Sequence, residues 1–134
     1  MSNYSNCKTI LCIDDDDGVL GFHRALLERR GYTVLTAASA RQGLQIAAAC
    51  AVAAVIVDYH MPEMDGLEVA SAIKRIRPVP IIMVSSDEEI SEQVLKVVDA
   101  FVSKDEAPIR LLPVISQICG EDPSDSPQRA RITA

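Results

Sequence analysis

The sequence is poor in the residues that build zinc sites, disulfide frameworks and aromatic surfaces. Its 134 residues include no Trp, two His and four Cys, and aromatic residues make up 4%. The cysteines show no C-x-x-C spacing, and neither His23 nor His60 is near one of them in the sequence, which argues against a zinc site. We therefore expect Cys12, Cys50 and Cys119 to be small buried hydrophobic residues in a reducing compartment.

Long apolar runs and excess positive charge are absent as well. The longest apolar run, Ile46 to Val57, has 12 residues, whereas a membrane-spanning helix needs about 20. The first ten residues lack the basic region and apolar core of a secretory signal. A net charge of −6 argues against unaided binding to nucleic acid or an anionic membrane. These absences favour a cytoplasmic protein with no membrane insertion and no direct nucleic-acid contact.

What remains is the composition of one folded domain. Apolar residues make up 49% and charged residues 24% of a chain close to the usual domain size. Residues 1–8 are polar, and residues 121–134 are rich in Pro, Ser and charge without periodicity. We expect a flexible leader over 1–8, a domain over 9–120 and a disordered tail over 121–134.

Short apolar runs alternate with amphipathic segments along this domain. The runs predict five buried strands, at Thr9–Ile13, Thr33–Thr36, Ala53–Val57, Pro80–Val84 and Ala100–Ser103. Helical spacing predicts a helix after each strand; the inward residues of the third are Leu67, Ala70, Ile73 and Ile76, and those of the fifth are Ile109, Leu112, Ile115 and Ile118. This alternation predicts an α/β fold, a parallel sheet with helices on both faces.

Two local patterns bear on helix boundaries. Ser86 and Glu89 have the S-x-x-E spacing of a capping box, which predicts the start of the fourth helix. Pro113 interrupts the fifth helical pattern, and a proline inside a helix removes a hydrogen bond. Either that helix starts late enough to place Pro113 in its first turn, or it kinks there.

Polar residues follow four of the predicted strands. Asp14–Asp17 follow the first, Asp58 the third, Ser85 the fourth and Lys104 the fifth. Parallel sheets place their sites at the carboxyl ends of the strands. Two carboxylates about 4 Å apart repel by roughly 4 kcal/mol at an effective dielectric of about 20, so the cluster calls for a cation. Helix capping accounts for Asp16 or Asp17 but not for the whole group.

The chemistry of this edge suits phosphoryl transfer. Carboxylate oxygens with retained waters suit Mg²⁺, with Mn²⁺ as an alternative. Lys104 adds a compact positive charge and Ser85 a hydroxyl donor. An aspartate with such neighbours is equipped to accept a phosphoryl group, because that transfer needs mainly positioning and charge neutralisation.

Four segments resemble the receiver domains of bacterial two-component response regulators, over roughly residues 8–119. They are the ILCIDDD run, the VIVDYHMPEMDG segment, IIMVSS and FVSK, in the family's order and at about its spacing. The resemblance implies a single-domain, chemotaxis-regulator-like protein with a flavodoxin-like, doubly wound, five-stranded parallel sheet in the order 2-1-3-4-5.

The resemblance also assigns roles at matching positions. It implies that Asp58 is the phosphoacceptor, that Asp15 binds Mg²⁺ directly and that Asp14 acts largely through water. The remaining roles are the backbone carbonyl of His60 as a metal ligand, Ser85 and Lys104 as partners of the phosphoryl oxygens, and Phe101 as the switch aromatic. We expect the Phe101 ring to be substantially inward before phosphorylation, because it has no hydroxyl group that burial would leave without a hydrogen bond.

Two departures from the family pattern are visible. Asp105 follows Lys104 where most receivers have a proline after a cis bond, and we expect a trans bond here because a non-proline cis bond costs about 2.5–4 kcal/mol. The connection between the fourth helix and fifth strand is also about three residues shorter than usual, by the resemblance. Both changes put the partner choice and the switch geometry of the usual signalling face in question.

The resemblance implies that the chain takes a phosphoryl group from a histidine kinase or a histidine phosphotransfer protein. Its only catalysis would be its own phosphoryl acceptance and dephosphorylation, and with fifteen residues after 119 its output would be contact with a downstream protein. Two alternatives stay open: a receiver-like binding module that is no longer phosphorylated, and an aspartate-nucleophile phosphohydrolase. His60 occupies the position of the hydrolases' second carboxylate, which disfavours the latter.

Overall fold

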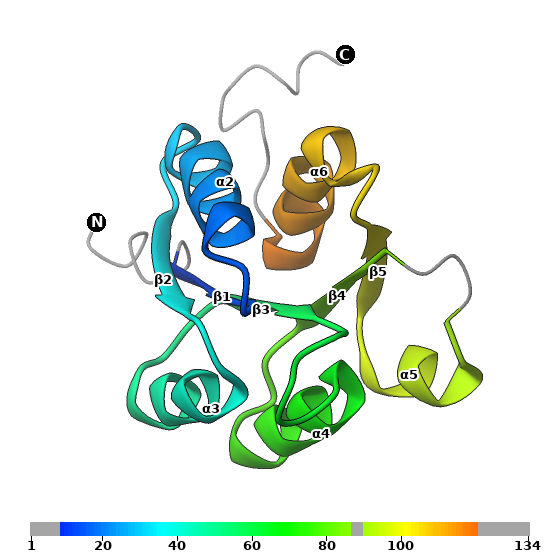
Figure 1. The fold of residues 1–134 in the computed structure, drawn as a ribbon. Helices are drawn as coiled ribbons and strands as arrows, with labels where there is room; N and C mark the ends of the chain where they lie inside the picture. The colour runs from blue at the N-terminus through cyan, green and yellow to red at the C-terminus, as the bar shows by residue number, and fades with distance from the viewer. Residues whose placement is uncertain (1–8, 87–89, 121–134) are drawn as a thin grey trace.

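The computed structural model describes residues 9–86 and 90–120, in which strands and helices alternate (Figure 1). The elements are β1 (Thr9–Ile13), α2 (Asp17–Glu28), β2 (Thr33–Ala37), α3 (Ala40–Ala49), β3 (Ala54–Asp58), α4 (Gly66–Ile76), β4 (Ile81–Ser85), α5 (Glu92–Val97), β5 (Ala100–Ser103) and α6 (Ala107–Cys119). The predicted leader and tail lie outside the described residues.

All five strands form one parallel sheet in the order β2-β1-β3-β4-β5. This confirms the predicted flavodoxin-like, doubly wound sheet. Every residue of β3 and β4 is buried, as expected of central parallel strands covered on both faces. The strand order places the ends of β1, β3 and β4 side by side at one edge.

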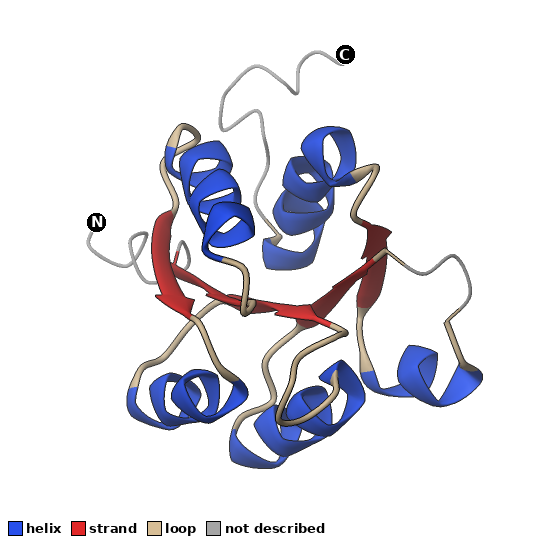
Figure 2. Cartoon of the chain, viewed as in Figure 1, coloured by secondary structure: helices blue, strands red, loops and turns tan. Residues whose placement is uncertain are grey.

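Helices cover the sheet in two layers (Figures 1 and 2). Helices α2 and α6 lie on one face, where Leu27, Leu111 and Ile115 pack with Ile10 and Ile56 of the sheet. Helices α3, α4 and α5 lie on the other, and their buried residues pack with the opposite side chains of the same strands. Because successive strand residues point to opposite faces, each apolar run supplies both cores.

Side-chain caps fix the starts of four helices. Asp16 caps α2, Ser39 caps α3, and Ser91 caps α5. Asp65 and Glu68 form a reciprocal capping box at the start of α4. Aspartate and serine are preferred there because their oxygens satisfy backbone N–H groups that have no partner within the helix.

The fourth predicted helix starts later than expected. Helix α5 begins at Glu92, and the Ser91 side chain accepts a hydrogen bond from the Val94 N–H at 3.3 Å. The proposed start at Ser86 is therefore wrong, while its partner Glu89 lies outside the described residues. Both serines can cap a helix, and a capping pattern alone does not rank them.

The inward face of the last helix is also shifted. Helix α6 starts at Ala107, so Pro113 lies inside it and not in its first turn. With that start, Ala107, Leu111 and Ile115 face the sheet at four-residue spacing, and Ile109 is 80% exposed. The prediction that Ile109 points inward is wrong for this reason.

Smaller differences from the predictions concern one exposed side chain, two strand limits and two cysteines. Ile76, the last residue of α4, is 43% exposed instead of inward. Strands β3 and β4 each begin and end one residue later than predicted, so Asp58 and Ser85 are their last residues. Of the three described cysteines, all without disulfides, Cys12 is buried as expected, whereas Cys50 and Cys119 are only partly buried. No helix among the described residues is long and apolar enough to cross a membrane.

Candidate functional site

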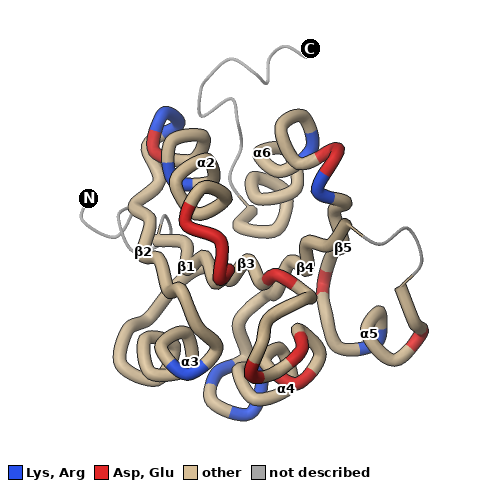
Figure 3. Tube along the Cα trace, viewed as in Figure 1, with Lys and Arg blue, Asp and Glu red and all other residues tan. Residues whose placement is uncertain are grey.

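The candidate site begins where β1 and β3 end. These strands are paired with Ile13 opposite Val57, so the next residues, Asp14 and Asp58, lie next to each other at the same edge. Figure 3 shows the acidic segment after β1 close to the acidic end of β3. The sequence-based expectation that these polar residues share one edge is thus met by the geometry.

Three carboxylates gather at this point. Asp14, Asp15 and Asp58 each offer an oxygen within 4.8 Å of the others. Asp14 and Asp58 are 2% and 3% exposed, whereas Asp15 is exposed. Two nearly buried carboxylates beside a solvent-facing third suit a hard cation that keeps part of its water shell, which is the preference of Mg²⁺.

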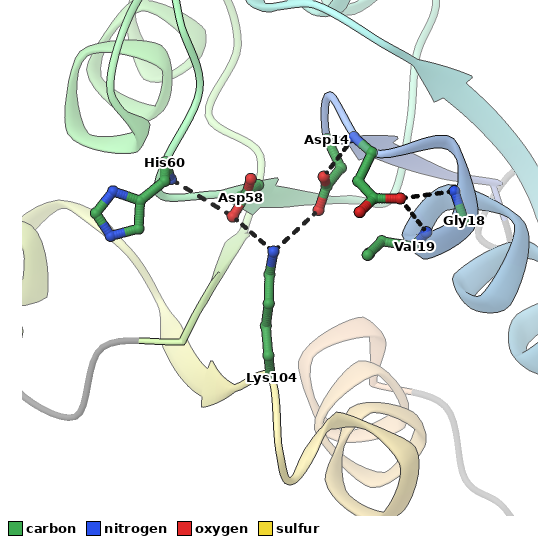
Figure 4. Close-up of polar contacts among 7 residues, drawn as sticks. Asp14, Gly18, Val19, Asp58, His60 and Lys104 are labelled. Carbon is green, nitrogen blue, oxygen red and sulfur yellow. Dashed lines mark hydrogen bonds and ion pairs between the residues drawn. The ribbon is translucent and has the colours of Figure 1, made fainter.

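Lys104 reaches this cluster from the loop after β5 (Figure 4). Its Nζ lies 3.3 Å from Asp58 Oδ1 and 3.8 Å from Asp14 Oδ2. The Lys104 backbone N–H donates to the Ser85 carbonyl oxygen at 2.9 Å, which ties the loop to the end of β4. One ammonium group therefore bridges the two buried carboxylates and only partly balances them.

The environment raises the pKa of both buried carboxyl groups. Burial raises the pKa of Asp14 from 3.8 to about 6; the Asp16 N–H and Lys104 oppose this, and Asp58 and Asp15 add to it. Burial likewise raises the pKa of Asp58, against the opposing effect of Lys104 and the His60 N–H. The ionised forms of Asp14 and Asp58 are thus disfavoured, and a bound cation would stabilise them.

Backbone donors hold the two carboxylates in position. The Asp16 N–H donates to Asp14 Oδ1 at 2.9 Å, and the His60 N–H donates to Asp58 Oδ1 at 3.4 Å (Figure 4). Asp16 in turn accepts hydrogen bonds from Gly18 and Val19, so the segment after β1 is anchored to α2. Of the two residues predicted as possible helix caps, Asp16 or Asp17, the structure shows Asp16 in that role.

The loop after Asp58 is closed by its own hydrogen bond. The Gly66 N–H donates to the Tyr59 carbonyl oxygen at 2.7 Å. A Cβ at Gly66 would lie 2.7 Å from both Tyr59 Cα and Met83 Sδ, so this close approach requires glycine. Gly66 therefore shapes the loop that follows Asp58.

The remaining predicted residues lie at or near the edge. Ser85 is fully buried at the end of β4. Phe101, opposite Met83 in the sheet, is half-buried against the core shared by α3, α4 and α5. The coordination by the His60 carbonyl and the switch role of Phe101 stay predictions. The described residues contain no cis peptide bond, so Lys104–Asp105 is trans as expected.

One neighbour of the site was not singled out for function in the sequence. His23 of α2 is 3% exposed, and burial, with a contribution from Lys104, lowers its pKa to about 4. Its proximity to Lys104 depends on how α2 and α6 pack, which helical spacing does not reveal.

Comparison with known proteins gives the family of this fold and site. The family model "Response regulator receiver domain" matches residues 10–116. A CheY-like response regulator receiver domain from Methanospirillum hungatei JF-1 has a TM-score of 0.80 and 31% identity, covering 84% of this chain and 94% of that one. The response regulator TrrA from Thermotoga maritima, in complex with Mg²⁺-BeF, has a TM-score of 0.78 and 25% identity, covering 83% and 98%.

Among curated proteins, the transcriptional regulatory protein GlrR of Escherichia coli (strain K12) is 35% identical over 86 residues. That match covers 63% of this chain but only 19% of GlrR, so the chain spans about a fifth of that relative's length. The similarity therefore concerns the receiver part alone. The family model covers most of the chain, and the structural neighbours share its fold and strand order. The chain belongs to the response regulator receiver domain family of two-component systems.

Proposed function

We propose that the chain is a phosphoacceptor receiver in which Asp58 takes a phosphoryl group from a phosphohistidine. The observation that carries this is the position of Lys104, whose Nζ lies 3.3 Å from Asp58 and 3.8 Å from Asp14. These two carboxylates and that of Asp15 form one group. One site thus contains a nucleophilic carboxylate, an ammonium group for the transferred oxygens and ligands for a metal ion.

In the proposed step, an Asp58 carboxylate oxygen attacks phosphorus. A P–O bond forms as the P–N bond to the donor imidazole breaks, and the electron pair of that bond stays on the imidazole nitrogen. Lys104 opposes the rise that burial causes in the pKa of Asp58, and it offers positive charge to the phosphoryl oxygens. In the later dephosphorylation, a water oxygen attacks phosphorus as the P–O bond to Asp58 breaks; inorganic phosphate leaves with the protons of the water, and the Asp58 carboxylate is restored. No other enzymatic activity is proposed.

Asp14, Asp15 and Asp58 would hold a divalent cation, with the His60 carbonyl as a further ligand by family resemblance. Three convergent carboxylate oxygens with little compensating charge fit such an ion. When bound, Mg²⁺ or Mn²⁺ supplies charge neutralisation for the oxygens of the phosphoryl group. Ser85, buried at the end of β4, is the proposed hydroxyl partner of those oxygens, and Phe101 the proposed switch residue.

The proposed partners follow from this chemistry. A histidine kinase or a histidine phosphotransfer protein supplies the phosphoryl group, and a downstream protein reads the phosphorylated state. The net charge of −6 disfavours unaided contact with nucleic acid, so we propose that the chain signals through contact with a protein.

Intact-mass measurement after incubation with acetyl phosphate and Mg²⁺ tests the proposal. Wild type and Asp105→Asn, whose substitution lies at an exposed aspartate beside Lys104, are expected to gain one phosphoryl group. Asp58→Asn is expected to gain none, and a chelator is expected to suppress the gain in wild type. Absence of any gain in wild type with Mg²⁺ present would instead support a binding module that is not phosphorylated.

A further inference from the structure

The turn that carries Lys104 is held at both of its ends. It runs from Ser103, the last residue of β5, to Glu106, the N-cap residue of α6. On the sheet side, the Lys104 backbone N–H donates to the Ser85 carbonyl oxygen at 2.9 Å. Across the turn, the Glu106 N–H donates to the Ser103 carbonyl oxygen at 3.1 Å. The backbone around Lys104 is thus tied to the sheet on one side and to a helix on the other.

The Ser103 side chain adds a second acceptor to this turn. Its Oγ accepts the Glu106 N–H at 3.3 Å, so the hydroxyl and carbonyl oxygens of Ser103 share one donor. Shared hydrogen bonds of this kind are common at helix termini. The hydroxyl bond therefore ties the side chain of the residue before Lys104 to the residue at which α6 begins.

The two central residues of the turn do not restrict its backbone by themselves. They are Lys104 and Asp105, and neither is a proline, whose ring would fix one φ angle. Asp105 is also exposed, so packing around its side chain does not hold the turn in place. A turn of this composition depends on its hydrogen bonds for a single conformation, and the Ser103 hydroxyl group supplies one of them.

The direction of the Lys104 side chain depends on this backbone. Its Nζ lies at the end of a flexible carbon chain, 3.3 Å from Asp58 Oδ1 and 3.8 Å from Asp14 Oδ2 (Figure 4). The side chain is 32% exposed, so the surrounding protein does not enclose it fully. A displacement of about 1 Å at a reacting site can cost on the order of 100-fold in rate. The conformation of the turn therefore bears directly on the charge that faces Asp58.

We propose that Ser103 is a positioning residue, whose hydroxyl group fixes the turn and so directs the Lys104 ammonium group at the two buried carboxylates. Ser103 acts through Lys104 and not on the phosphoryl group itself. Its effect on the rate of phosphorylation rests on the proposed function. Its effect on the placement of Lys104 beside Asp58 does not, so the two can be measured separately.

The rate of phosphorylation of the full chain by acetyl phosphate, with Mg²⁺ present, gives the first test. We expect Ser103→Ala to react about 3- to 10-fold more slowly than wild type, the value of one net hydrogen bond. On the Lys104→Met background the same substitution should have no further effect, because Ser103 acts through the lysine. A general loss of structure would instead slow both backgrounds by the same factor.

Three further variants separate the hydroxyl group from the rest of the side chain. Ser103→Thr keeps a hydroxyl group and should react at the wild-type rate, whereas Ser103→Val, which lacks it, should be as slow as Ser103→Ala. This pair decides the matter if Ser103→Ala does not fold. Ser39→Ala removes a similar bond, in which Ser39 Oγ accepts the Gln42 N–H at 3.1 Å. Because Ser39 follows β2, at the opposite edge of the sheet from β5, this control should keep the wild-type rate.

Titration of the Asp58 carboxyl group, followed by carbon NMR in the metal-free protein, needs no phosphorylation. Lys104 lowers the pKa of Asp58 against the effect of burial, so a displaced ammonium group lets that pKa rise. We expect a rise in Ser103→Ala and Ser103→Val, in the direction seen with Lys104→Met, and none in Ser103→Thr or Ser39→Ala.

The proposal is overturned if Asp58 titrates as in wild type in both variants that lack the Ser103 hydroxyl group. It is also overturned if Ser103→Ala slows the Lys104→Met protein as much as it slows wild type. If wild type gains no phosphoryl group at all, the proposed function fails, and the titration alone then decides whether Ser103 positions Lys104.

Discussion

Replacing Asp14 with asparagine should stabilise the metal-free protein at neutral pH. Asp14 is 2% exposed, and its pKa is raised from 3.8 to about 6. A raised carboxyl pKa means that the folded state binds more protons than the unfolded state between those two values. The free energy of unfolding therefore falls as the pH rises from about 4 to 6 and stays reduced above that range.

The size of the effect follows from the shift. At about 1.4 kcal/mol for each pH unit, a shift from 3.8 to about 6 corresponds to roughly 3 kcal/mol at pH 7. The side-chain oxygen of the introduced asparagine can still accept the hydrogen bond from the Asp16 N–H, so little else is lost. We expect Asp14→Asn to gain about 2–3 kcal/mol at pH 7 and close to nothing below pH 4.

Urea unfolding in the presence of a chelator, repeated between pH 4 and 8, measures this gain. Asp105→Asn removes one negative charge at an exposed position and serves as the control, with an expected change within about 0.5 kcal/mol. With saturating Mg²⁺ the advantage of Asp14→Asn should shrink, because wild type then gains from binding. A gain that is absent, or that is the same at pH 4 and pH 7, would refute the assignment of strain to this carboxylate.

Three further predictions concern the metal, the lysine and the glycines. Asp15→Asn should weaken Mg²⁺ binding at least about tenfold in calorimetric titration, since it removes a carboxylate from the group of three; unchanged affinity would exclude Asp15 as a ligand. Lys104→Met should slow phosphorylation by acetyl phosphate about tenfold or more, because the charge 3.3 Å from Asp58 is lost; a wild-type rate would contradict its proposed role. Gly66→Ala should lower the free energy of unfolding by about 1–3 kcal/mol, because the new Cβ would meet Tyr59 and Met83. Gly21→Ala, with nothing within 4 Å, should raise it by about 0.5–1 kcal/mol; thermal unfolding of the pair checks both signs.

Much of the fold could be predicted because its strands are short, continuous apolar runs that end in polar residues. Strands β3 and β4 both begin and end one residue later than predicted, because the polar residue that follows each apolar run is the last residue of the strand. In the structure the ladder continues, and the Tyr59 N–H donates to the Val84 carbonyl oxygen at 2.9 Å. Asp58 and Ser85 are thus held by the sheet itself, which positions them more rigidly than a loop would.

Helix phase was harder to predict, because it depends on where a helix starts. Pro108 lies in the first turn of α6, which sets the start at Ala107 and turns Ile109 outward. At α5 two serines compete as caps, and Ser91 is the one used. In both cases the apolar spacing predicted a helix correctly but did not locate its first residue.

The candidate site, too, could be predicted only in part. Asp14, Asp58, Ser85 and Lys104 were found because each follows or ends a strand, and parallel strands bring their ends together. Their spacing, the buried state of Asp14 and the bridging by Lys104 depend on side-chain packing. The burial of His23 depends likewise on how α2 packs with the sheet and with α6, which no local pattern could reveal.

Locating the acyl phosphate on one residue is the sharpest test of Asp58 as the phosphoacceptor. Borohydride reduces an aspartyl phosphate to homoserine, so the modified residue can be read by peptide mass spectrometry after incubation with acetyl phosphate and Mg²⁺. We expect homoserine at position 58 and at no other aspartate, with no conversion when the chelator is present. Conversion at Asp14 or Asp15, or stable phosphate on a hydroxyl residue with Asp58 unmodified, would contradict it.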